Sequence, residues 1–374
     1  MISRSDVDKL LSVHSDGLPV LSLYLRVPRD VVELRGLPAR ADELFALAAR
    51  DSSPGGTPVR VGHAEREAAR GLLSAGARDW LGHTVAIFAC EQLGLAEAIP
   101  LPIKLQERAV LATRPHVRPL LLAIQRCPPH RVVVADRRHA WLFSVAGEDI
   151  QATALPDAEG MRSRGFSGWY GLEAYRVNEL IIELARQHYR DTAALLERAA
   201  RAGGAEPLII GGHRDAIPQI LAALPAELRD SFAGSFAADP DTLTPAKVRA
   251  LASQVITDWL NHRDQQLTAE ISQQPPGTLA ATGLNACIAA ANLHAVRLLA
   301  VPAGGLIPGC ACQRCGALSS AGAGCAHEPQ HCLAVPDLIE ELAVVTLADG
   351  GQVRTLHDPP AGIAALLRFP LVQQ

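Results

Sequence analysis

The sequence has little of several features that mark common classes of protein. Lysine occurs only three times, so 32 of the 35 basic residues are arginine, and the formal net charge is -4. The large basic excess of a duplex-DNA binder is therefore missing. Aromatic residues make up 4% of the chain, yet 48% of the residues are hydrophobic and 20% are charged. This balance excludes a disordered chain and, at roughly 150 residues per domain, provides material for two to three domains.

Long apolar runs are also missing. The richest stretch, residues 279–303, is interrupted by asparagine, histidine and arginine, so no run of eighteen apolar residues can serve as a membrane span. Asp6, Asp8 and Lys9 stand where the apolar core of a secretory leader would lie. We therefore expect a cytoplasmic protein that has no membrane partner.

Five of the eight cysteines, by contrast, lie within the 23 residues from Cys310 to Cys332. A disulfide-bonded secreted protein is short and spreads its cysteines, which does not fit this chain. The segment Cys312-Gln-Arg-Cys315-Gly is a knuckle that presents two thiolates to one ion, and a second pair of ligands begins ten residues later. We predict a structural Zn²⁺ on Cys312, Cys315, Cys325 and Cys332. The spacing of the second pair is irregular, which leaves His327, His331 and Cys310 as alternatives for the fourth ligand.

The pattern of apolar residues predicts an α/β chain of three domains. The first, residues 1–118, is a mixed α/β domain, and the proline-rich passage at 115–129 marks a boundary or an entry strand. The last, residues 265–374, is a compact α/β sandwich that carries the cysteine-rich insertion at 308–333. The expected strands of these domains cover 20–25, 84–90, 95–100, 297–301 and 352–356, and the expected helices cover 40–50, 64–78, 278–293 and 336–348.

The middle domain, residues 119–264, has the clearest pattern. Three strands at 131–136, 140–145 and 150–155 form an antiparallel meander, and helices then alternate with strands. This βββ-α-β-α-β-α order is the order of a ribonuclease H-like sheet. The later elements are expected as helices at 172–201, 215–230 and 245–262, and as strands at 207–210 and 232–237.

One loop of the middle domain, residues 160–176, has an unusual composition. It holds four glycines, three arginines and four of the 15 aromatic residues. Aromatic rings beside guanidinium groups suit stacking on unpaired bases and clamping of phosphates. A connection whose rings fold back onto the sheet explains the composition equally well. The candidate RNA contacts are Arg162, Arg164, Tyr170 and Arg176.

A single carboxylate raises the question of nuclease activity. Asp136 ends the first strand of the meander, where ribonuclease H enzymes keep a metal-binding carboxylate. The strand at 207–210 instead runs into Gly211-Gly212-His213, which we interpret mainly as a tight turn. A two-metal nuclease needs several converging carboxylates, so a metal-dependent nuclease is the least favoured function.

Several segments, taken in order along nearly the whole chain, resemble the bacterial relatives of archaeo-eukaryotic peptide-chain release factors, and among them family 10. They are Pro19–Leu25, Val85–Ala89, Val132–Phe143, Gly168-Trp169, Leu208–His213, the cysteine knuckle and Gly362–Phe369. The resemblance implies a C-terminal domain of the ribosomal-protein-like RNA-binding type. It also implies a factor whose partners are the ribosome and tRNA, and whose middle-domain loop reaches the peptidyl-transferase centre.

Release factors of this superfamily carry Gly-Gly-Gln in that loop, and many bacterial relatives carry Gly-Gly-Trp-Ser-Gln. Here Ser167-Gly168-Trp169 matches in part, whereas no glutamine lies between Gln151 and Gln187. The resemblance implies Gly168 and Trp169 as the catalytic residues of peptidyl-tRNA hydrolysis, if backbone N–H groups suffice. The Pelota branch lacks the motif and acts in ribosome rescue without hydrolysis. Two hypotheses follow: a release or rescue factor that hydrolyses peptidyl-tRNA, and a non-catalytic ribosome- or tRNA-binding factor.

Overall fold

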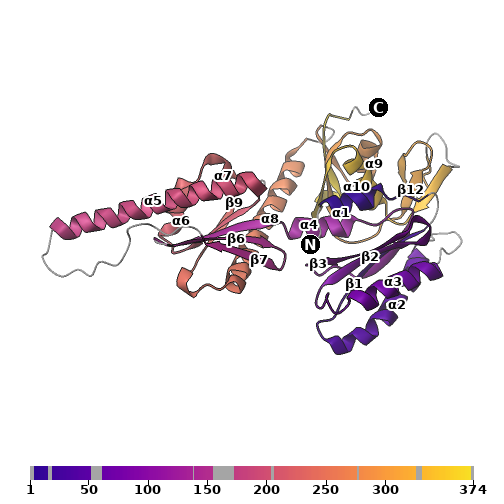
Figure 1. The fold of residues 1–374 in the computed structure, drawn as a ribbon. Coiled ribbons are helices and arrows are strands. Elements are labelled where there is room, and N and C mark those ends of the chain that lie inside the picture. The colour runs from indigo at the N-terminus through magenta and orange to yellow at the C-terminus, as the bar shows by residue number, and fades with distance from the viewer. Residues whose placement is uncertain are drawn as a thin grey trace. The chain divides into compact units, whose positions relative to one another are not determined.

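The computed structural model (Figure 1) describes residues 4–15, 19–51, 61–137, 139–154, 172–203, 206–275, 278–325 and 331–371. The chain divides into two compact units: Met1–Arg126 together with Asp264–Gln374, and Cys127–Arg263. We call the two parts of the first unit the N-terminal lobe and the C-terminal lobe, and the second unit the middle unit. The predicted multidomain α/β class is confirmed, whereas the domain boundaries near 118 and 264 stay predictions.

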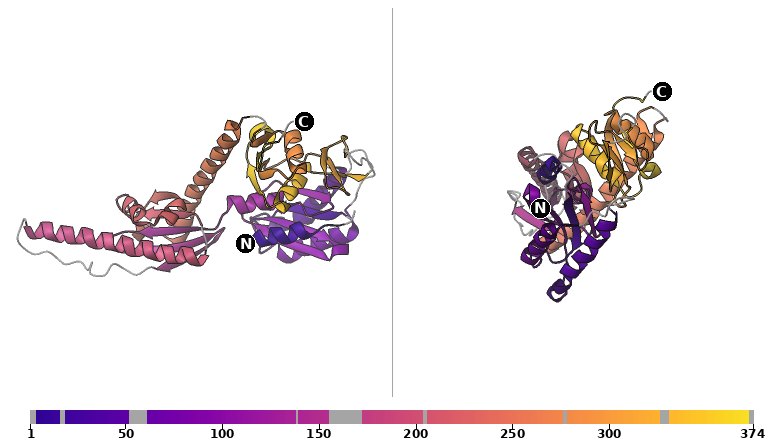
Figure 2. Two further views of the ribbon diagram at one scale, coloured as in Figure 1. Left: turned by 90° about the horizontal axis from the view of Figure 1, so that it is seen from above. Right: turned by 90° about the vertical axis from the view of Figure 1, so that its right-hand side faces the viewer.

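The N-terminal lobe contains one antiparallel sheet with the strand order β3-β2-β1-β4. Its strands are β1 (Val20–Arg26), β2 (Thr84–Cys90), β3 (Leu95–Leu101) and β4 (Arg108–Ala112). Helices α2 (Leu37–Asp51) and α3 (His63–Gly76) cover one face, which Leu21, Leu23 and Leu25 share. Tyr24 and Phe88 point to the opposite face, where helices α1 (Arg4–Ser12) and α4 (Arg118–Arg126) lie (Figure 2). Because both faces are covered, every residue of β1 except Arg26 is buried.

Helix α4 corrects one expectation. Of the two alternatives for the proline-rich passage at 115–129, a boundary or an entry strand, the entry strand is wrong, because Arg118–Arg126 forms a helix. Pro119 lies in the first turn of that helix, where its missing N–H would have no partner within the helix. The proline therefore favours the start of this helix.

The C-terminal lobe contains a four-stranded sheet and a smaller three-stranded sheet. The larger sheet has the order β10-β16-β11-β15, with β11 and β15 parallel, and the smaller has the order β13-β12-β14. Its strands are β10 (Ala280–Thr282), β11 (Val296–Pro302), β12 (Gly309–Cys312), β13 (Leu318–Ser320), β14 (Cys332–Val335), β15 (Gln352–Leu356) and β16 (Ala364–Leu367). Helices α9 (Leu284–Asn292) and α10 (Leu338–Ala348) pack into the core that this lobe shares with the N-terminal lobe.

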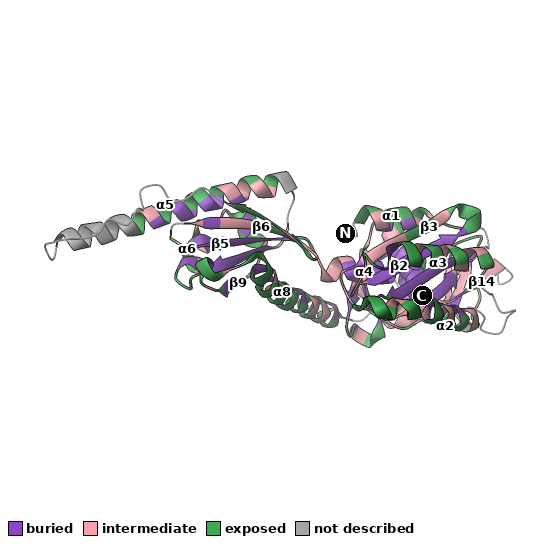
Figure 3. Cartoon of the chain, turned by 60° about the horizontal axis from the view of Figure 1, so that its bottom comes forward, coloured by how far each residue is buried: buried purple, intermediate pink, exposed green. Residues whose placement is uncertain are grey.

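The middle unit contains a five-stranded sheet with the order β7-β6-β5-β8-β9. Strands β5 (His130–Ala135), β6 (Ala140–Ala146) and β7 (Asp149–Ala154) form the predicted antiparallel meander. Strands β8 (Leu208–Gly212) and β9 (Phe232–Ala237) extend it in parallel. Helices α5 (Leu172–Gly203), α6 (Ala216–Ala223) and α7 (Ala226–Asp230) cover one face, and α8 (Pro245–Gln273) covers the other. The central strands β5 and β8 are accordingly buried, whereas β7 and β9 at the sheet edges are largely exposed or half-buried, and the outer faces of the helices are exposed (Figure 3).

Two helices of the middle unit differ from expectation. The single helix predicted at 215–230 is the pair α6 and α7, because Leu224 adopts an extended conformation before Pro225. Helix α8 does not end near 262 but continues to Gln273. Its last turns leave the middle unit, and Leu267 and Ile271 pack against the sheet of the C-terminal lobe. None of the helices in the described part of the chain is long and apolar enough to cross a membrane.

Candidate functional site

For the loop that carries most of the predicted functional residues, the structure describes mainly the flanking elements. Gly168 and Trp169, with the RNA-contact candidates Arg162, Arg164 and Tyr170, lie outside the described residues. Arg176 lies in the first two turns of α5, where the structure describes the backbone alone. These assignments therefore stay predictions, and the flanking elements provide the geometry.

The strand that leads into this loop ends at a defined edge of the sheet. Strand β7 is antiparallel to β6, which is antiparallel to β5, so β7 runs in the direction of β5, β8 and β9. Ala154 opposes Trp141, and Trp141 opposes Val134 near the carboxyl end of β5. Gly212 opposes Ala135 in the same way. The loop thus leaves the sheet at the carboxyl edge, where open α/β sheets bind their ligands.

A cavity opens at this carboxyl edge. It is lined by residues that follow β5, β8 and β9: Asp136, Arg137, His139, His213, Asp215 and Asp241. Arg137 Nη2 lies 2.7 Å from Asp215 Oδ2, and this hydrogen bond lowers the pKa of Asp215 and raises the pKa of Arg137. The N–H of His139 donates to Asp136 Oδ1 at 2.7 Å, which closes the turn after β5.

Gly212 fixes how closely the two central strands approach. Its φ of 142° lies in a region that favours glycine, and a Cβ at this position would lie 2.1 Å from the carbonyl oxygen of Ala135. The prediction of a tight turn at Gly211-Gly212-His213 is therefore wrong for the two glycines, which are the last paired residues of β8, and His213 follows them at the cavity.

Sequence reasoning missed two carboxylates at this edge. No acidic residue ends the predicted strand 207–210, but Asp215 and Asp241 lie a few residues beyond β8 and β9. The fold alone brings them together, because parallel strands end side by side. Their ligand atoms, however, do not belong to either of the two groups of described residues that gather three potential metal ligands within 4.8 Å. This arrangement gives no support to a two-metal nuclease.

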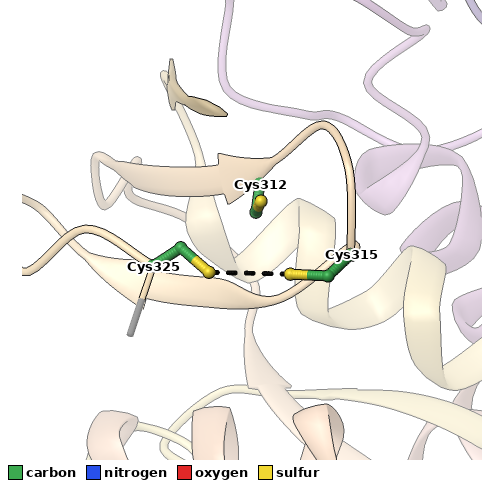
Figure 4. A group of neighbouring side chains, drawn as sticks. All are labelled: Cys312, Cys315 and Cys325. Carbon is green, nitrogen blue, oxygen red and sulfur yellow. Dashed lines mark hydrogen bonds between the residues drawn. The ribbon is translucent and has the colours of Figure 1, made fainter. Parts of the chain in front are cut away.

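The first of those two groups is the predicted cysteine cluster. The sulfur atoms of Cys312, Cys315 and Cys325 all lie within 4.8 Å of one another, and the Cys315 and Cys325 sulfurs are 3.6 Å apart (Figure 4). The N–H groups of Cys315 and Arg314 donate to the Cys312 thiol and lower its pKa. The N–H of Ala317 donates to the Cys315 thiol, but the neighbouring thiols raise the pKa of Cys315 overall. Backbone N–H groups turned toward sulfur are the geometry that the knuckle predicts.

The fourth predicted ligand, Cys332, lies beside these three but is not among them. It directly opposes Cys312 in the β12–β14 pair, so the two side chains share a face. Burial raises the pKa of its thiol, to which the N–H of Cys325 donates. Cys310, on β12, precedes Cys312 by two residues and is half-buried. His331 borders β14, and His327 lies outside the described residues.

The fold and the site together define a multidomain α/β protein with a meander-led middle sheet and a cysteine knuckle. Residues 115–263 match the family described as bacterial archaeo-eukaryotic release factor family 10. The match covers the middle segment of this chain, and the resemblance drawn from the sequence is confirmed.

Solved structures and curated proteins were compared as well. An archaeal translation termination factor, aRF1, is 15% identical, with 98% of this chain and 99% of that chain covered and a TM-score of 0.24. A chain in a model of ribosome-bound archaeal Pelota and ABCE1 is 15% identical, with 99% and 95% covered and a TM-score of 0.42. Dom34 of S. cerevisiae, described as a translation termination-like factor involved in RNA quality control, is 11% identical, with 79% and 82% covered and a TM-score of 0.40. The comparison with curated proteins found no match.

Proposed function

We propose that this chain is a translation release or rescue factor that acts on the ribosome in the cytoplasm, with the ribosome and tRNA as partners. The observation that carries the proposal is the match of residues 115–263 to a release factor family. The sheet of the middle unit supports it, because an antiparallel meander extended by two parallel strands is the ribonuclease H-like arrangement expected for the middle domain. The C-terminal lobe would then be the domain of the RNA-binding type.

In this proposal the loop at 160–176 hydrolyses the ester between peptide and tRNA. Gly168 would bring a backbone N–H close to the reacting carbonyl, where a preorganised donor stabilises the developing negative charge. Trp169 would stack on the acceptor end of the tRNA. Arg162, Arg164 and Arg176 would contact phosphates, for which the planar guanidinium is well suited. Tyr170 would add a second ring for stacking.

A non-catalytic rescue factor is the second candidate, and one observation favours it. No glutamine occurs between Gln151 and Gln187, so the side chain that release factors place in this loop is missing. If hydrolysis requires that side chain, the protein would bind the ribosome without releasing the peptide.

Release of labelled peptide from purified ribosome–peptidyl-tRNA complexes separates the two candidates. We expect the wild-type chain to release peptide, and Gly168→Ala and Trp169→Ala to reduce release at least about tenfold, while ribosome binding is kept. Arg201→Ala is the matched control, because Arg201 lies near the end of α5, is exposed and forms an ion pair with Glu197. Binding without release by the wild type would identify the non-catalytic factor. Absence of both would contradict the proposed function.

We also propose that one structural Zn²⁺ is bound by Cys312, Cys315, Cys325 and Cys332. A tetrahedral site with Zn–S bonds of about 2.3 Å separates its sulfur atoms by about 3.8 Å. The 3.6 Å between the Cys315 and Cys325 sulfurs is close to this value. Four thiolates leave no open position for water, so the ion would tie β12 to β14 and have no catalytic part.

Metal analysis of protein purified without added zinc tests this site. We expect about one Zn²⁺ per chain in the wild type and a clear loss in Cys312→Ser and Cys332→Ser. Cys127→Ser is the control, because Cys127 is half-buried and lies in the other unit. Full zinc binding by Cys332→Ser would assign the fourth position to another ligand, and a zinc-free wild type would contradict the site.

A further inference from the structure

Four buried polar side chains meet where the N-terminal and C-terminal lobes pack together. His116 and Arg118 come from the N-terminal lobe, and Asp337 and Glu340 come from α10 and the residue before it. Their exposed fractions are 1%, 1%, 2% and 4%. More than 200 residues of sequence separate the two pairs. We call these four residues the interlobe network.

The guanidinium of Arg118 reaches fully into the C-terminal lobe. Its Nη2 donates to Asp337 Oδ2 at 2.5 Å and to the carbonyl oxygen of Gly305 at 2.6 Å. Its Nη1 donates to the carbonyl oxygen of Pro302 at 3.0 Å. A buried charge is tolerated when it is paired and hydrogen-bonded in this way. All three acceptors belong to the opposite lobe.

Glu340, on the C-terminal lobe, accepts hydrogen bonds from the start of a helix of the N-terminal lobe. Helix α4 begins at Arg118, so the N–H groups at its start have no partner within the helix. The N–H of Val117 donates to Glu340 Oε1 at 2.6 Å, and the N–H of Arg118 donates to Glu340 Oε2 at 3.0 Å. A carboxylate at a helix N-terminus also interacts favourably with the helix dipole. Helix α4 is therefore capped from the other lobe.

His116 and Asp337 connect the network to β1 in the N-terminal lobe and to α10 in the C-terminal lobe. His116 Nε2 lies 3.0 Å from Asp337 Oδ2. The backbone of His116 is held on β1, where its N–H donates to Ser22 Oγ and its carbonyl accepts from the Tyr24 hydroxyl. Asp337 is the N-cap of α10 and accepts from the N–H of Ile339. The contacts thus run continuously from β1 to α10.

The network is not arranged to hold a metal ion, although ligand atoms of His116, Asp337 and Glu340 lie within 4.8 Å of one another. The charged group of Arg118 already lies on Asp337 Oδ2, and backbone N–H groups occupy both oxygens of Glu340. The guanidinium supplies the positive charge that a cation would supply.

We propose that the interlobe network holds the two lobes together as one rigid body. The protecting structure of both lobes would then open and close in one cooperative step. The lobes also share an apolar core, but the hydrophobic effect is non-directional. A buried set of paired, hydrogen-bonded charges contributes specificity of arrangement more than net stability. Within the unit formed by Met1–Arg126 and Asp264–Gln374, the two lobes would then move as one.

Native-state hydrogen exchange on the full chain tests this proposal. Leu23 and Leu299 are fully buried markers of the central strands β1 and β11, one in each lobe. In the wild type we expect their N–H groups to exchange through one common opening reaction. The free energy of opening should then depend on the urea concentration in the same way at both residues. In Glu340→Ala the two openings should separate. The N–H groups of Val117 and Arg118 should exchange at least about tenfold faster, because each loses its only acceptor.

The control is Thr346→Val on the same helix, because Thr346 is equally buried but donates only to Leu342 within α10. This variant should keep the common opening. Protection of Val133 in the middle unit verifies that each variant is folded there. If Glu340→Ala fails to fold, Glu340→Gln replaces it, since it keeps one acceptor oxygen but loses the charge. Separate openings in the wild type, or a common opening in the tested Glu340 variant, would overturn the proposal.

Discussion

Replacing Gly212 by alanine should destabilise the middle unit strongly. Gly212 has a φ of 142°, a conformation whose cost for an L-residue is about 1–3 kcal/mol. The added Cβ would also lie 2.1 Å from the carbonyl oxygen of Ala135, in the backbone of the neighbouring strand β5. Backbone within a hydrogen-bonded pair of strands cannot move aside without breaking the pair. The two effects together give an expected loss of about 3 kcal/mol or more.

The measurement is urea unfolding of the full chain followed by hydrogen exchange at Ile210, which lies on β8 and is fully buried. Gly94→Ala is the matched control, because Gly94 has a φ of 61° but no atom within 4 Å of the added Cβ. Leu23, in the same lobe as Gly94, reports on that variant, and the expected loss is about 1 kcal/mol. A loss in Gly212→Ala no larger than that of Gly94→Ala would refute the claim that β5 and β8 meet too closely for a side chain.

Three further predictions concern buried or partly buried polar groups. Asp264→Asn should cost about 1–3 kcal/mol in thermal unfolding, because its carboxylate binds Arg126 and Arg354, whereas exposed Asp258→Asn should cost almost nothing. Burial raises the pKa of Asp337, but its hydrogen bond to His116 and the charge of Arg118 lower it overall. The stability of the wild type should therefore fall as the pH drops below about 4. The stability of Asp337→Asn should fall less, when urea midpoints are compared across pH. Tyr189→Phe should leave the unfolding temperature unchanged or slightly higher, because burial raises the pKa of Tyr189 to about 12 and its hydroxyl has no hydrogen-bond partner among the described residues.

The fold of the middle unit could be predicted from the sequence because its signals are local. Apolar strands at 131–136 and 140–145 are separated by a polar turn, and strand 207–210 is bounded by glycines. Each of these predictions falls within about a residue or two of β5, β6 and β8. The end of α8 was predicted too early, although Pro275 and Pro276 are a local stop signal directly beyond Gln273. The local pattern does not encode the contact of Ile271 with the C-terminal lobe.

The candidate sites show the same division. The grouping of Cys312, Cys315 and Cys325 could be predicted from spacing, because the first two are three residues apart and the third follows ten residues later. Asp215 and Asp241 at the carboxyl edge were missed, since they are far from Asp136 in sequence and meet it only through strand order. The interlobe network joins residues more than 200 positions apart, and its members stand in unremarkable sequence surroundings.

If this protein binds RNA as proposed, the charges at the carboxyl edge restrict which groups can contact it. The cavity lining holds three aspartates and one arginine, a net of -2 with histidine neutral, which repels phosphate. The segment 160–176 holds three arginines and one glutamate, a net of +2, and the strand before it ends at the same edge. Phosphate contacts at this edge should therefore come from the loop arginines alone. With three such contacts, the logarithm of the affinity for single-stranded RNA should fall with the logarithm of the salt concentration with a slope of about -2. A much steeper slope would mean that another surface of the chain binds the RNA.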